Sequence, residues 1–350
     1  MNINTYKKSG VNIQKIRYAQ KNMEKNIEKS YNYQNVGKII SGFGHYSGLI
    51  GIGKQVLALH TDGVGTKVLI AQALKKFDTV GIDCVAMNVN DIICTGAEPF
   101  AFVDYIGLKS ANKKIIGKII KGLIRGAKLG RVSIVGGETA VIPELVAGDS
   151  DDFFDLSGTA IGVTEEKKLI LGDKIEVGDK ILGIESTGLH SNGYTLARKV
   201  LSKYSMNDSP EFLDQSLGEE LLKPTRIYVE PIMKAIKDKK IKINGLAHIT
   251  GGSFTKLNRL NKKINYNLEK FPEIRGIFKQ IQYDGKIETK EMYKTFNMGI
   301  GFCIILSPNF VDLIQSIFDK CKMKIFELGH VDKGTGKVIV KIDGKSQILV

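Results

Sequence analysis

The sequence predicts a protein of mixed α/β class that is built from two domains. Helical periodicity alternates along the chain with short runs of β-branched and apolar residues, which is typical of interleaved helices and strands. A polar stretch at residues 165–179 contains the run EEKK and two Gly-Asp pairs, and it separates two halves that each show this alternation. A length of 350 residues fits two ordinary domains, and 43% hydrophobic residues suffice for a core in each. We therefore predict one domain over residues 1–166 and a second over residues 167–350.

The first clear strand covers residues 56–59 (VLAL) and leads directly into the segment HTDGVGTK at residues 60–67. Residues 83–95 predict a helix that ends at Gly96. Its apolar residues recur at helical spacing and predict a buried line: Val85, Val89 and Ile92. A polar line is expected beside them: Cys84, Asn88, Asp91 and Thr95.

Residues 110–129 predict an amphipathic helix, because isoleucine and leucine recur there at every third or fourth position. A short strand at residues 132–135 (VSIV) is expected to stop abruptly at a pair of glycines. This strand would present the next four residues at its carboxyl end: Gly136, Gly137, Glu138 and Thr139.

The remaining elements continue the alternation into the second half. They are a strand at 155–163, a strand at 180–185, a helix at 191–204 with Ser191 as its N-cap, a helix opened by Pro224, a strand at 301–306, a helix at 308–321 and a strand at 324–331.

The net charge of +14 arises from lysines that are spread along the whole chain. The densest basic runs, at residues 237–240 and 261–263, contain no interleaved aromatic residues for stacking on bases, so we expect no nucleic-acid partner. A basic protein does suit an anionic substrate. No apolar run approaches the roughly 20 residues needed to cross a bilayer, and the N-terminal residues are polar. We therefore expect no membrane segment and a cytoplasmic protein.

The four cysteines show no C-x-x-C spacing and mostly have apolar neighbours. This pattern favours reduced core thiols over disulfides or zinc ligands. The residues concerned are Cys84, Cys94, Cys303 and Cys321.

The segment at residues 60–67 combines an acid, two glycines, a hydroxyl and a lysine at the end of a strand. Glycines let backbone N–H groups approach an anion, lysine supplies positive charge, and a carboxylate can hold Mg²⁺ against phosphate oxygens. The same residues also suit an ordinary turn. Two further acid-bearing segments, at residues 88–91 and 136–139, favour a phosphate site, although a solvated helix face and a surface turn explain them individually.

Residues 48–54 (GLIGIGK) have the spacing of a Walker A loop, but two features argue against one. Gln55 stands where a metal-binding hydroxyl is needed, and a strand follows instead of a helix whose N-terminus would receive phosphate. Two segments of the second half, at residues 187–194 and 248–253, place His190 and His248 beside glycines and hydroxyls. Such histidines are either structural or serve as acid–base groups and anion donors.

The order of motifs resembles the phosphoribosylformylglycinamidine cyclo-ligase family, also called aminoimidazole ribonucleotide (AIR) synthetase, over nearly the whole chain. In the first half the motifs are YKKSGV (6–11), GFG (42–44), HTDGVGTK (60–67), GIDCVAMNVND (81–91), GAEP (96–99) and GGETA (136–140). In the second half they are GLHSNGY (188–194), PTRIY (224–228), HITGG (248–252) and EMYKTFNMGIG (291–301). The acid-rich motifs are shared with thiamine-monophosphate kinase and selenophosphate synthetase, whereas the later motifs point to the cyclo-ligase.

The resemblance implies a two-domain AIR-synthetase-like fold in which the N-terminal sheets of two subunits close a barrel across a homodimer, with a C-terminal α/β domain. It also implies ATP-driven closure of an imidazole ring, in which formylglycinamidine ribonucleotide and ATP give AIR, ADP and phosphate. The implied ATP-binding residues are Gly42, Phe43, Gly44, Asp62, Gly63, Gly65, Thr66, Lys67 and Asp91, with Asp62 and Asp91 holding Mg²⁺. The implied substrate-binding residues are Gly136, Gly137, Glu138, Thr139, His190, Ser191 and Asn192. The implied catalytic residues are His190, His248 and Asp62.

The chain departs from the family pattern after Val11, where a basic residue commonly found near the nucleotide has no secure counterpart. Lys21 and Lys25 are the candidates to replace it. Ser41 stands where a glycine is frequent. Two other functions stay open at this point: another ATP-dependent kinase-like member of the same superfamily, and a non-catalytic binder of nucleotide or nucleic acid.

Overall fold

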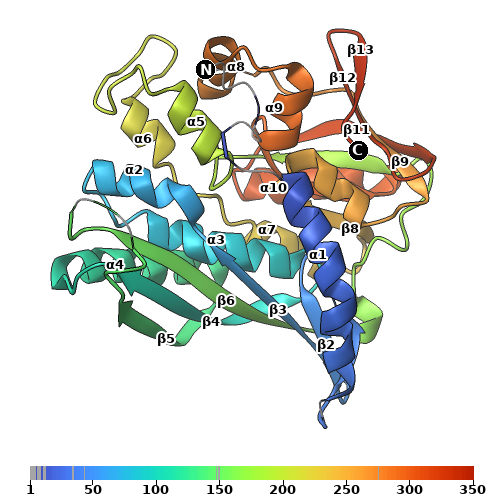
Figure 1. Ribbon diagram of the computed structural model, residues 1–350. Coiled ribbons are helices and arrows are strands. Elements are labelled where there is room, and N and C mark those ends of the chain that lie inside the picture. Colours follow the sequence, from blue (N-terminus) through green and yellow to red (C-terminus); the bar gives the residue numbers. More distant parts are fainter. Residues whose placement is uncertain are drawn as a thin grey trace.

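The protein contains two β-sheets, one in each half of the chain (Figure 1). The computed structural model describes residues 5, 9–10, 13–33, 35–42, 44–146, 148, 150–274 and 276–350. The first sheet has the strand order β1-β2-β3-β6-β4-β5, and the second has the order β13-β12-β9-β11-β7-β10-β8. Between them, η3 (Glu166–Lys168) and a loop carry the chain from one sheet to the other.

The strands of the first sheet are β1 (Lys38–Ser41), β2 (Gly48–Ile52), β3 (Gln55–Gly63), β4 (Glu98–Leu108), β5 (Ser133–Val141) and β6 (Phe154–Glu165). Its helices are α1 (Ile13–Glu28), η1 (Lys29–Asn32), η2 (Gly65–Lys67), α2 (Val68–Ala73), α3 (Val80–Ile93) and α4 (Lys113–Gly130). All pairs in this sheet are antiparallel except β4 with β5.

The strands of the second sheet are β7 (Lys180–Glu185), β8 (Ile243–His248), β9 (Ile264–Leu268), β10 (Ile300–Leu306), β11 (Ile325–Lys333), β12 (Val338–Ile342) and β13 (Lys345–Ile348). The helices of this half are α5 (Tyr194–Val200), α6 (Leu217–Leu221), α7 (Val229–Lys237), η4 (Ser253–Arg259), α8 (Ile277–Gly285), α9 (Thr289–Thr295), η5 (Pro308–Phe310) and α10 (Val311–Lys320). Every residue of β10 is buried, so the core of this half is centred on that strand.

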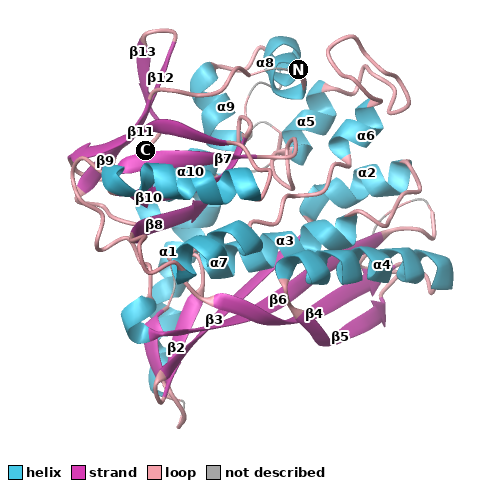
Figure 2. Ribbon diagram, turned by 180° about the vertical axis from the view of Figure 1, so that it is seen from behind, coloured by secondary structure: helices cyan, strands magenta, loops and turns pink. Residues whose placement is uncertain are grey.

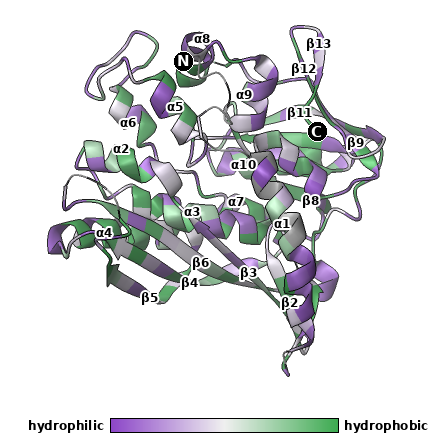
Figure 3. Cartoon of the chain, viewed as in Figure 1, coloured by the Kyte–Doolittle hydropathy of each residue, from purple (hydrophilic) through white to green (hydrophobic). Residues whose placement is uncertain are grey.

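One face of the first sheet is covered by α3 and α4, and α3 separates this sheet from the second half (Figures 1 and 2). The two helices approach closely because they meet at glycines: a Cβ atom on Gly81 would lie 2.3 Å from the backbone nitrogen of Leu123. No helix or strand of the described residues covers the other face of the sheet, and hydrophobic residues occur along the strands of the sheet as far as β5 at its edge (Figure 3). Its exposed large apolar side chains are Phe100, Val103, Tyr105, Val135 and Val141.

The predicted mixed α/β class is confirmed, and β7 begins and ends where the sequence placed it. The prediction of abrupt termination at Gly136 is wrong, because the long strand β4 supplies hydrogen-bonding partners for β5 as far as Val141. The hairpin of β2 and β3 occupies the segment with Walker A spacing, which agrees with its rejection. The cysteines are free thiols, and all except Cys321 are buried.

Two predicted helix starts in the second half are also wrong. The N-cap of α5 is Gly193, with a φ of 77°, because the hydroxyl of Ser191 is directed to Asp83 of α3 instead. Helix α7 begins at Val229 and not at Pro224, because side chains of α3 hydrogen-bond the backbone of the intervening residues. Among the described residues, no helix is long and apolar enough to cross a membrane.

Candidate active site

Asp91, in the last turn of α3, lies at the centre of a largely buried cluster of titratable side chains between the two halves of the chain. His248, at the end of β8, lies with its Nδ1 2.6 Å from Oδ1 of Asp91. On the other carboxylate oxygen, Oδ2, the Nε2 of His60 is at 3.5 Å and the Nζ of Lys256 is at 4.0 Å. Strand β3, helix α3, strand β8 and helix η4 therefore each contribute one member of this cluster.

The surrounding charges favour the ionised form of Asp91. Burial alone would raise the pKa of Asp91, but Lys256 and the two histidines outweigh it and hold this pKa well below its usual range. For Asp62, burial and then the charge of Asp91 raise the pKa. Two neighbouring carboxylates that disfavour each other's charge create a position at which a cation is stabilising.

His248 uses both of its ring nitrogens inside the protein. Asn90 places its Nδ2 donor 3.4 Å from Nε2 of His248, which leaves Nδ1–H to donate to Asp91. The ring is fully buried and stacks on Phe302 at 6.1 Å between centroids. Burial lowers the pKa of His248, and the hydrogen bond to Asp91 opposes that effect only in part. His248 therefore orients the Asp91 carboxylate as a neutral imidazole.

His190 is also fully buried, in a different arrangement. Its Nε2 accepts the backbone N–H of Thr187 at 3.1 Å, so the neutral ring carries its proton on Nδ1. Burial, together with neighbouring cationic side chains, lowers the pKa of His190 well below 6.5. Within the described part of the chain, its Nδ1 and the Nδ2 of Asn192 are buried without a hydrogen-bond partner. These two donors of one loop can serve an acceptor supplied by a ligand.

Lys67 has a different place from the one predicted for it. Its ammonium group is fully buried, 2.8 Å from Oδ1 of Asp83, and it also donates to the carbonyl of Lys223 at 2.6 Å. The same Asp83 oxygen accepts the backbone N–H of Thr225 at 2.7 Å, the hydroxyl of Thr225 at 2.6 Å and the hydroxyl of Ser191 at 3.2 Å. Lys67 therefore joins the two halves of the chain and has no open side toward a nucleotide.

Asn90 makes a second connection between α3 and the same segment. Its Nδ2 donates to the carbonyl of Arg226 at 2.9 Å, and its Oδ1 accepts the N–H of Tyr228 at 2.9 Å. Asp83 and Asn90 are seven residues apart, which places them on one face of the helix. One helix thus positions both the carboxylate Asp91 and the two loops that carry Ser191 and Thr225.

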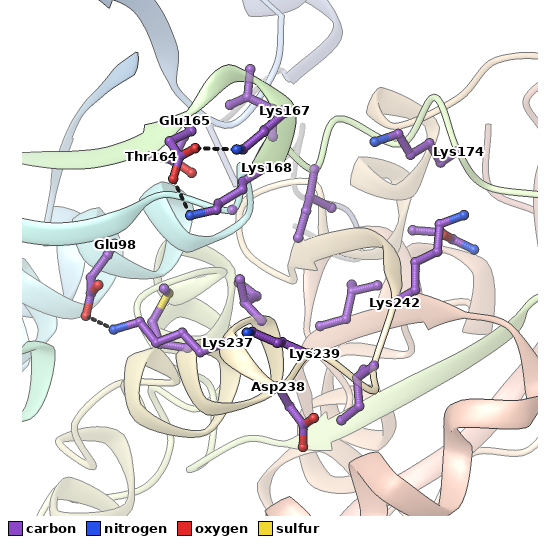
Figure 4. Close-up of a pocket in the computed structure, with 18 of the residues that line it drawn as sticks. Glu98, Thr164, Glu165, Lys167, Lys168, Lys174, Lys237, Asp238, Lys239 and Lys242 are labelled. Atoms are coloured by element: carbon purple, nitrogen blue, oxygen red, sulfur yellow. Dashed lines mark hydrogen bonds and ion pairs between the residues drawn. The ribbon is translucent and has the colours of Figure 1, made fainter. Parts of the chain in front are cut away.

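A cavity of about 640 Å³ on another part of the surface contains none of the predicted site residues (Figure 4). It lies where the end of β6 and η3 meet α7 and the start of β8. Two of its carboxylates are already paired with its lysines: Glu98 with Lys237, and Glu165 with Lys167 and Lys168. We place the candidate site elsewhere for this reason.

The cavity that does contain predicted residues has a volume of about 530 Å³ and is lined by Gly42, Gly44, His60, Thr61 and Arg259, among others. Local geometry favours glycine at both positions. A Cβ atom on Gly42 would lie 1.9 Å from the Tyr31 hydroxyl, and Gly44 has a φ of 107°.

Phe43, the N-terminal residues Tyr6, Lys7 and Val11, and the side chain of Lys21 lie outside the described residues. Lys25 is exposed on α1.

The segment Gly136 to Thr139 lies on the edge strand β5, separated from β3 by β4 and β6. All four of its residues are exposed, and Glu138 accepts the N–H of Thr139 at 2.8 Å. The structure therefore does not bring this segment together with His190, Ser191 and Asn192 within one chain.

Close to Asp62 lie three other predicted nucleotide-binding residues. Gly63 donates its N–H to the Asp62 carboxylate at 2.8 Å, and Gly65 adopts a φ of 67° where η2 begins. The hydroxyl of Thr66 is 3.2 Å from that of Thr195 on α5. This turn therefore contacts both the Asp62 carboxylate and the second half.

Sequence reasoning assigned no role to five residues of the site: His60, Asp83, Asn90, Lys256 and Arg259. The spacing of Asp83 and Asn90 by seven residues, or two helical turns, is visible in the sequence, as are two basic residues three apart after HITGG. Neither signal identifies its partner, because every partner lies on a distant segment.

The fold and the two halves of the chain define a class of protein. Residues 44–164 match the family described as AIR synthase related protein, N-terminal domain, and residues 176–341 match the corresponding C-terminal domain. Hydrogenase maturation protein HypE in complex with ATP has a similar fold, with a TM-score of 0.60, 16% identity and 84% of each chain covered. Thiamine-monophosphate kinase from Stenotrophomonas maltophilia is similar with a TM-score of 0.61 and 16% identity, over 91% of this chain and 95% of that one.

Relatives with higher identity define the particular family. A phosphoribosylformylglycinamidine cyclo-ligase of Pyrococcus furiosus is 45% identical, over 96% of this chain and 97% of the relative. The cyclo-ligases of Methanobrevibacter smithii and Methanosarcina barkeri are 44% and 47% identical, over 92% and 86% of this chain and 93% and 88% of the relatives. The chain belongs to the phosphoribosylformylglycinamidine cyclo-ligase family.

Proposed function

We propose that the protein closes the imidazole ring of AIR, with formylglycinamidine ribonucleotide and ATP as substrates and ADP and phosphate as the other products. The observation that carries this proposal is the identity of 44–47% with cyclo-ligases over most of both chains. A formamide oxygen is a poor leaving group, so the γ-phosphoryl group of ATP is transferred to it. The amidine nitrogen then attacks the formyl carbon, and the former formamide oxygen departs as part of inorganic phosphate. Such a reaction requires positioning and neutralisation of charge.

ATP is assigned to the cavity beside Gly42 and Gly44. Support comes from its volume of about 530 Å³, which suits a small ligand, and from the adjacent carboxylates of Asp62 and Asp91. The names of similar structures include complexes with ATP or an ATP analogue.

Mg²⁺ fits the carboxylate pair on chemical grounds. The raised pKa of Asp62 beside Asp91 marks a position where a divalent cation relieves repulsion. No group of three or more acidic, histidine or cysteine side chains that could hold a metal occurs among the described residues. Mg²⁺ commonly uses one or two carboxylates together with substrate phosphates, so it would arrive with ATP and neutralise the transferring phosphoryl group.

The second substrate is assigned to the loop that contains His190, Ser191 and Asn192. Its support is a pair of buried donors that have no partner among the described residues, the Nδ1–H of His190 and the Nδ2 group of Asn192. Two donors that no acceptor of the described residues satisfies suit a phosphate or a carbonyl oxygen. His190 then binds as a neutral donor, and His248 acts on Asp91 as a positioning residue.

A homodimer is proposed through the uncovered face of the first sheet. Its exposed apolar side chains on β4 and β5 form the type of surface that a second subunit buries: Phe100, Val103, Tyr105, Val135 and Val141. The exposed edge strand β5 supports the same arrangement, because an unpaired edge is commonly covered.

Substrate-dependent release of ADP tests the function. The protein should release ADP when formylglycinamidine ribonucleotide is present and not with thiamine monophosphate or selenide. ADP release with either of the latter substrates alone would assign the protein to another branch of the superfamily. ATP binding without any turnover would support a binding protein.

A further inference from the structure

Neutralisation of the ATP phosphates calls for a cationic side chain in addition to Mg²⁺, and the described residues among the predicted ATP-binding set do not provide one. Lys67 is fully buried and already holds Asp83. The basic residue that is common in the family after Val11 has no secure counterpart in this chain, and Lys25, one of the two candidates to replace it, is exposed on α1. This inference rests on the proposed function, because it concerns the nucleotide of that reaction.

Helix η4, in the second half of the chain, brings two cations to the nucleotide cavity. It is a 3₁₀ helix of residues Ser253–Arg259, in which side chains three positions apart lie on the same side. Lys256 and Arg259 have this spacing. The Nζ of Lys256 and the Cζ of Arg259 each lie 5.6 Å from the centre of the Tyr46 ring. Both cations therefore share one aromatic support.

The two cations have different surroundings. Lys256 is 6% exposed, its ammonium contacts the Thr250 hydroxyl, and it lies 4.0 Å from Asp91. Arg259 is exposed and has no carboxylate within ion-pair distance among the described residues. Of the described residues that line the cavity of Gly42 and Gly44, Arg259 is the one lysine or arginine. The ammonium group of Lys256 thus already contacts protein groups, whereas the guanidinium group of Arg259 is available to a ligand.

We propose that Arg259 binds the phosphates of ATP in this cavity, while Lys256 balances the charge of Asp91. A guanidinium group suits this task because its planar fork can donate two parallel hydrogen bonds to phosphate oxygens. The cation–π contact with Tyr46 restrains the group before ATP arrives, which reduces the entropy lost on binding. The nucleotide site is therefore completed by a residue of the second half.

Binding of nucleotides without the second substrate tests the proposal. Arg259→Ala, Arg259→Lys and wild type would be titrated with ATP and Mg²⁺ by calorimetry, and adenosine would be measured by competition against a fluorescent nucleotide. Arg125→Ala serves as the matched control, because Arg125 is exposed on α4 and pairs with Asp78.

Arg259→Ala should weaken ATP binding by about 10- to 100-fold, the expected effect of one charge-assisted contact. Adenosine should bind with unchanged affinity, Arg259→Lys should recover part of the loss, and Arg125→Ala should match wild type.

Two results would overturn the proposal while leaving the proposed function intact: wild-type affinity for ATP in Arg259→Ala, or an equal loss for ATP and adenosine, which would indicate a general disturbance of the cavity. A wild-type protein that binds no ATP would instead overturn the proposed function, and this inference with it.

Discussion

Replacement of Asp83 by asparagine removes the charge at the junction of the two halves while it conserves shape. Asparagine retains an acceptor oxygen for the N–H and hydroxyl of Thr225. The buried ammonium of Lys67, 2.8 Å from Asp83 and without solvent exposure, loses its counter-ion. Asp83→Asn therefore tests the charge and not the packing.

The expected cost follows from the burial of the pair. Removing one partner of a fully buried ion pair costs about 3–5 kcal/mol, because an unpaired charge stays in a medium of low dielectric. The unfolding entropy of a chain of 350 residues is about 0.7 kcal/mol/K at the melting temperature. We therefore expect the melting temperature of Asp83→Asn to fall by roughly 4–7 °C. The KM for formylglycinamidine ribonucleotide should rise as well, because Ser191 and Thr225 lose part of their anchor.

Thermal unfolding of a double-mutant cycle provides the assay. Adding Lys67→Met to Asp83→Asn removes the stranded ammonium and should restore most of the lost stability. The matched control is Glu230→Gln, which breaks ion pairs with Arg131 and Lys234 whose side chains are all about half exposed, and it should change stability by at most about 1 kcal/mol. The reasoning would be refuted if Asp83→Asn melted within a degree of wild type, or if the double variant were less stable than Asp83→Asn.

Three further predictions concern the site and the assembly. Asp91→Asn should lower ADP formation by about 100-fold or more in a protein that still shows a cooperative melting transition; near-normal turnover would remove Asp91 from the site. Because the folded state lowers the pKa of His190 below 6.5, the unfolded chain binds the extra proton, and stability should decrease as the pH falls below about 6.5 by up to about 1.4 kcal/mol per pH unit. His190→Asn, which tolerates the φ of 61°, should reduce this dependence in melting curves from pH 5 to 8, although the lowered pKa of His248 retains part of it, and an unchanged slope would contradict the reasoning. Sedimentation equilibrium should give twice 38.6 kDa for wild type and a monomer for Tyr105→Glu, so a fully active wild-type monomer would exclude the proposed dimer.

The sequence predicted elements well where one local signal was sufficient. Helix α4 is an example, since its apolar periodicity and its N-cap Asn112 lie within the element itself. The extended segment from Pro224 to Tyr228 is the opposite case. It has the composition of a helix start, but the side chains of Asp83 and Asn90, more than a hundred residues away, take up its backbone groups.

The residues of the candidate site show the same contrast between those that a local motif predicts and those whose contacts depend on distant segments. Asp62, Asp91 and the glycines were recognisable from their motifs, and the structure places Asp62 and Asp91 close enough for their charges to interact. The predicted phosphate contact of Lys67 was drawn from its place after glycines, yet a lysine in such a segment serves whichever anion is nearest in space. Here that anion is Asp83, and no property of the local sequence distinguishes it from a phosphate.

The polar face of α3 has a consequence for motion. Many two-domain enzymes close over their substrates by rotation about a hinge. In this protein Asp83 and Asn90 bind the backbone of Thr225, Arg226 and Tyr228, so separating the halves would strand buried donors and acceptors on both sides. The relative orientation of the carboxylate pair and the substrate loop is therefore fixed before either substrate binds. Binding energy is then free to be used on the reacting groups themselves and not on reorienting two domains.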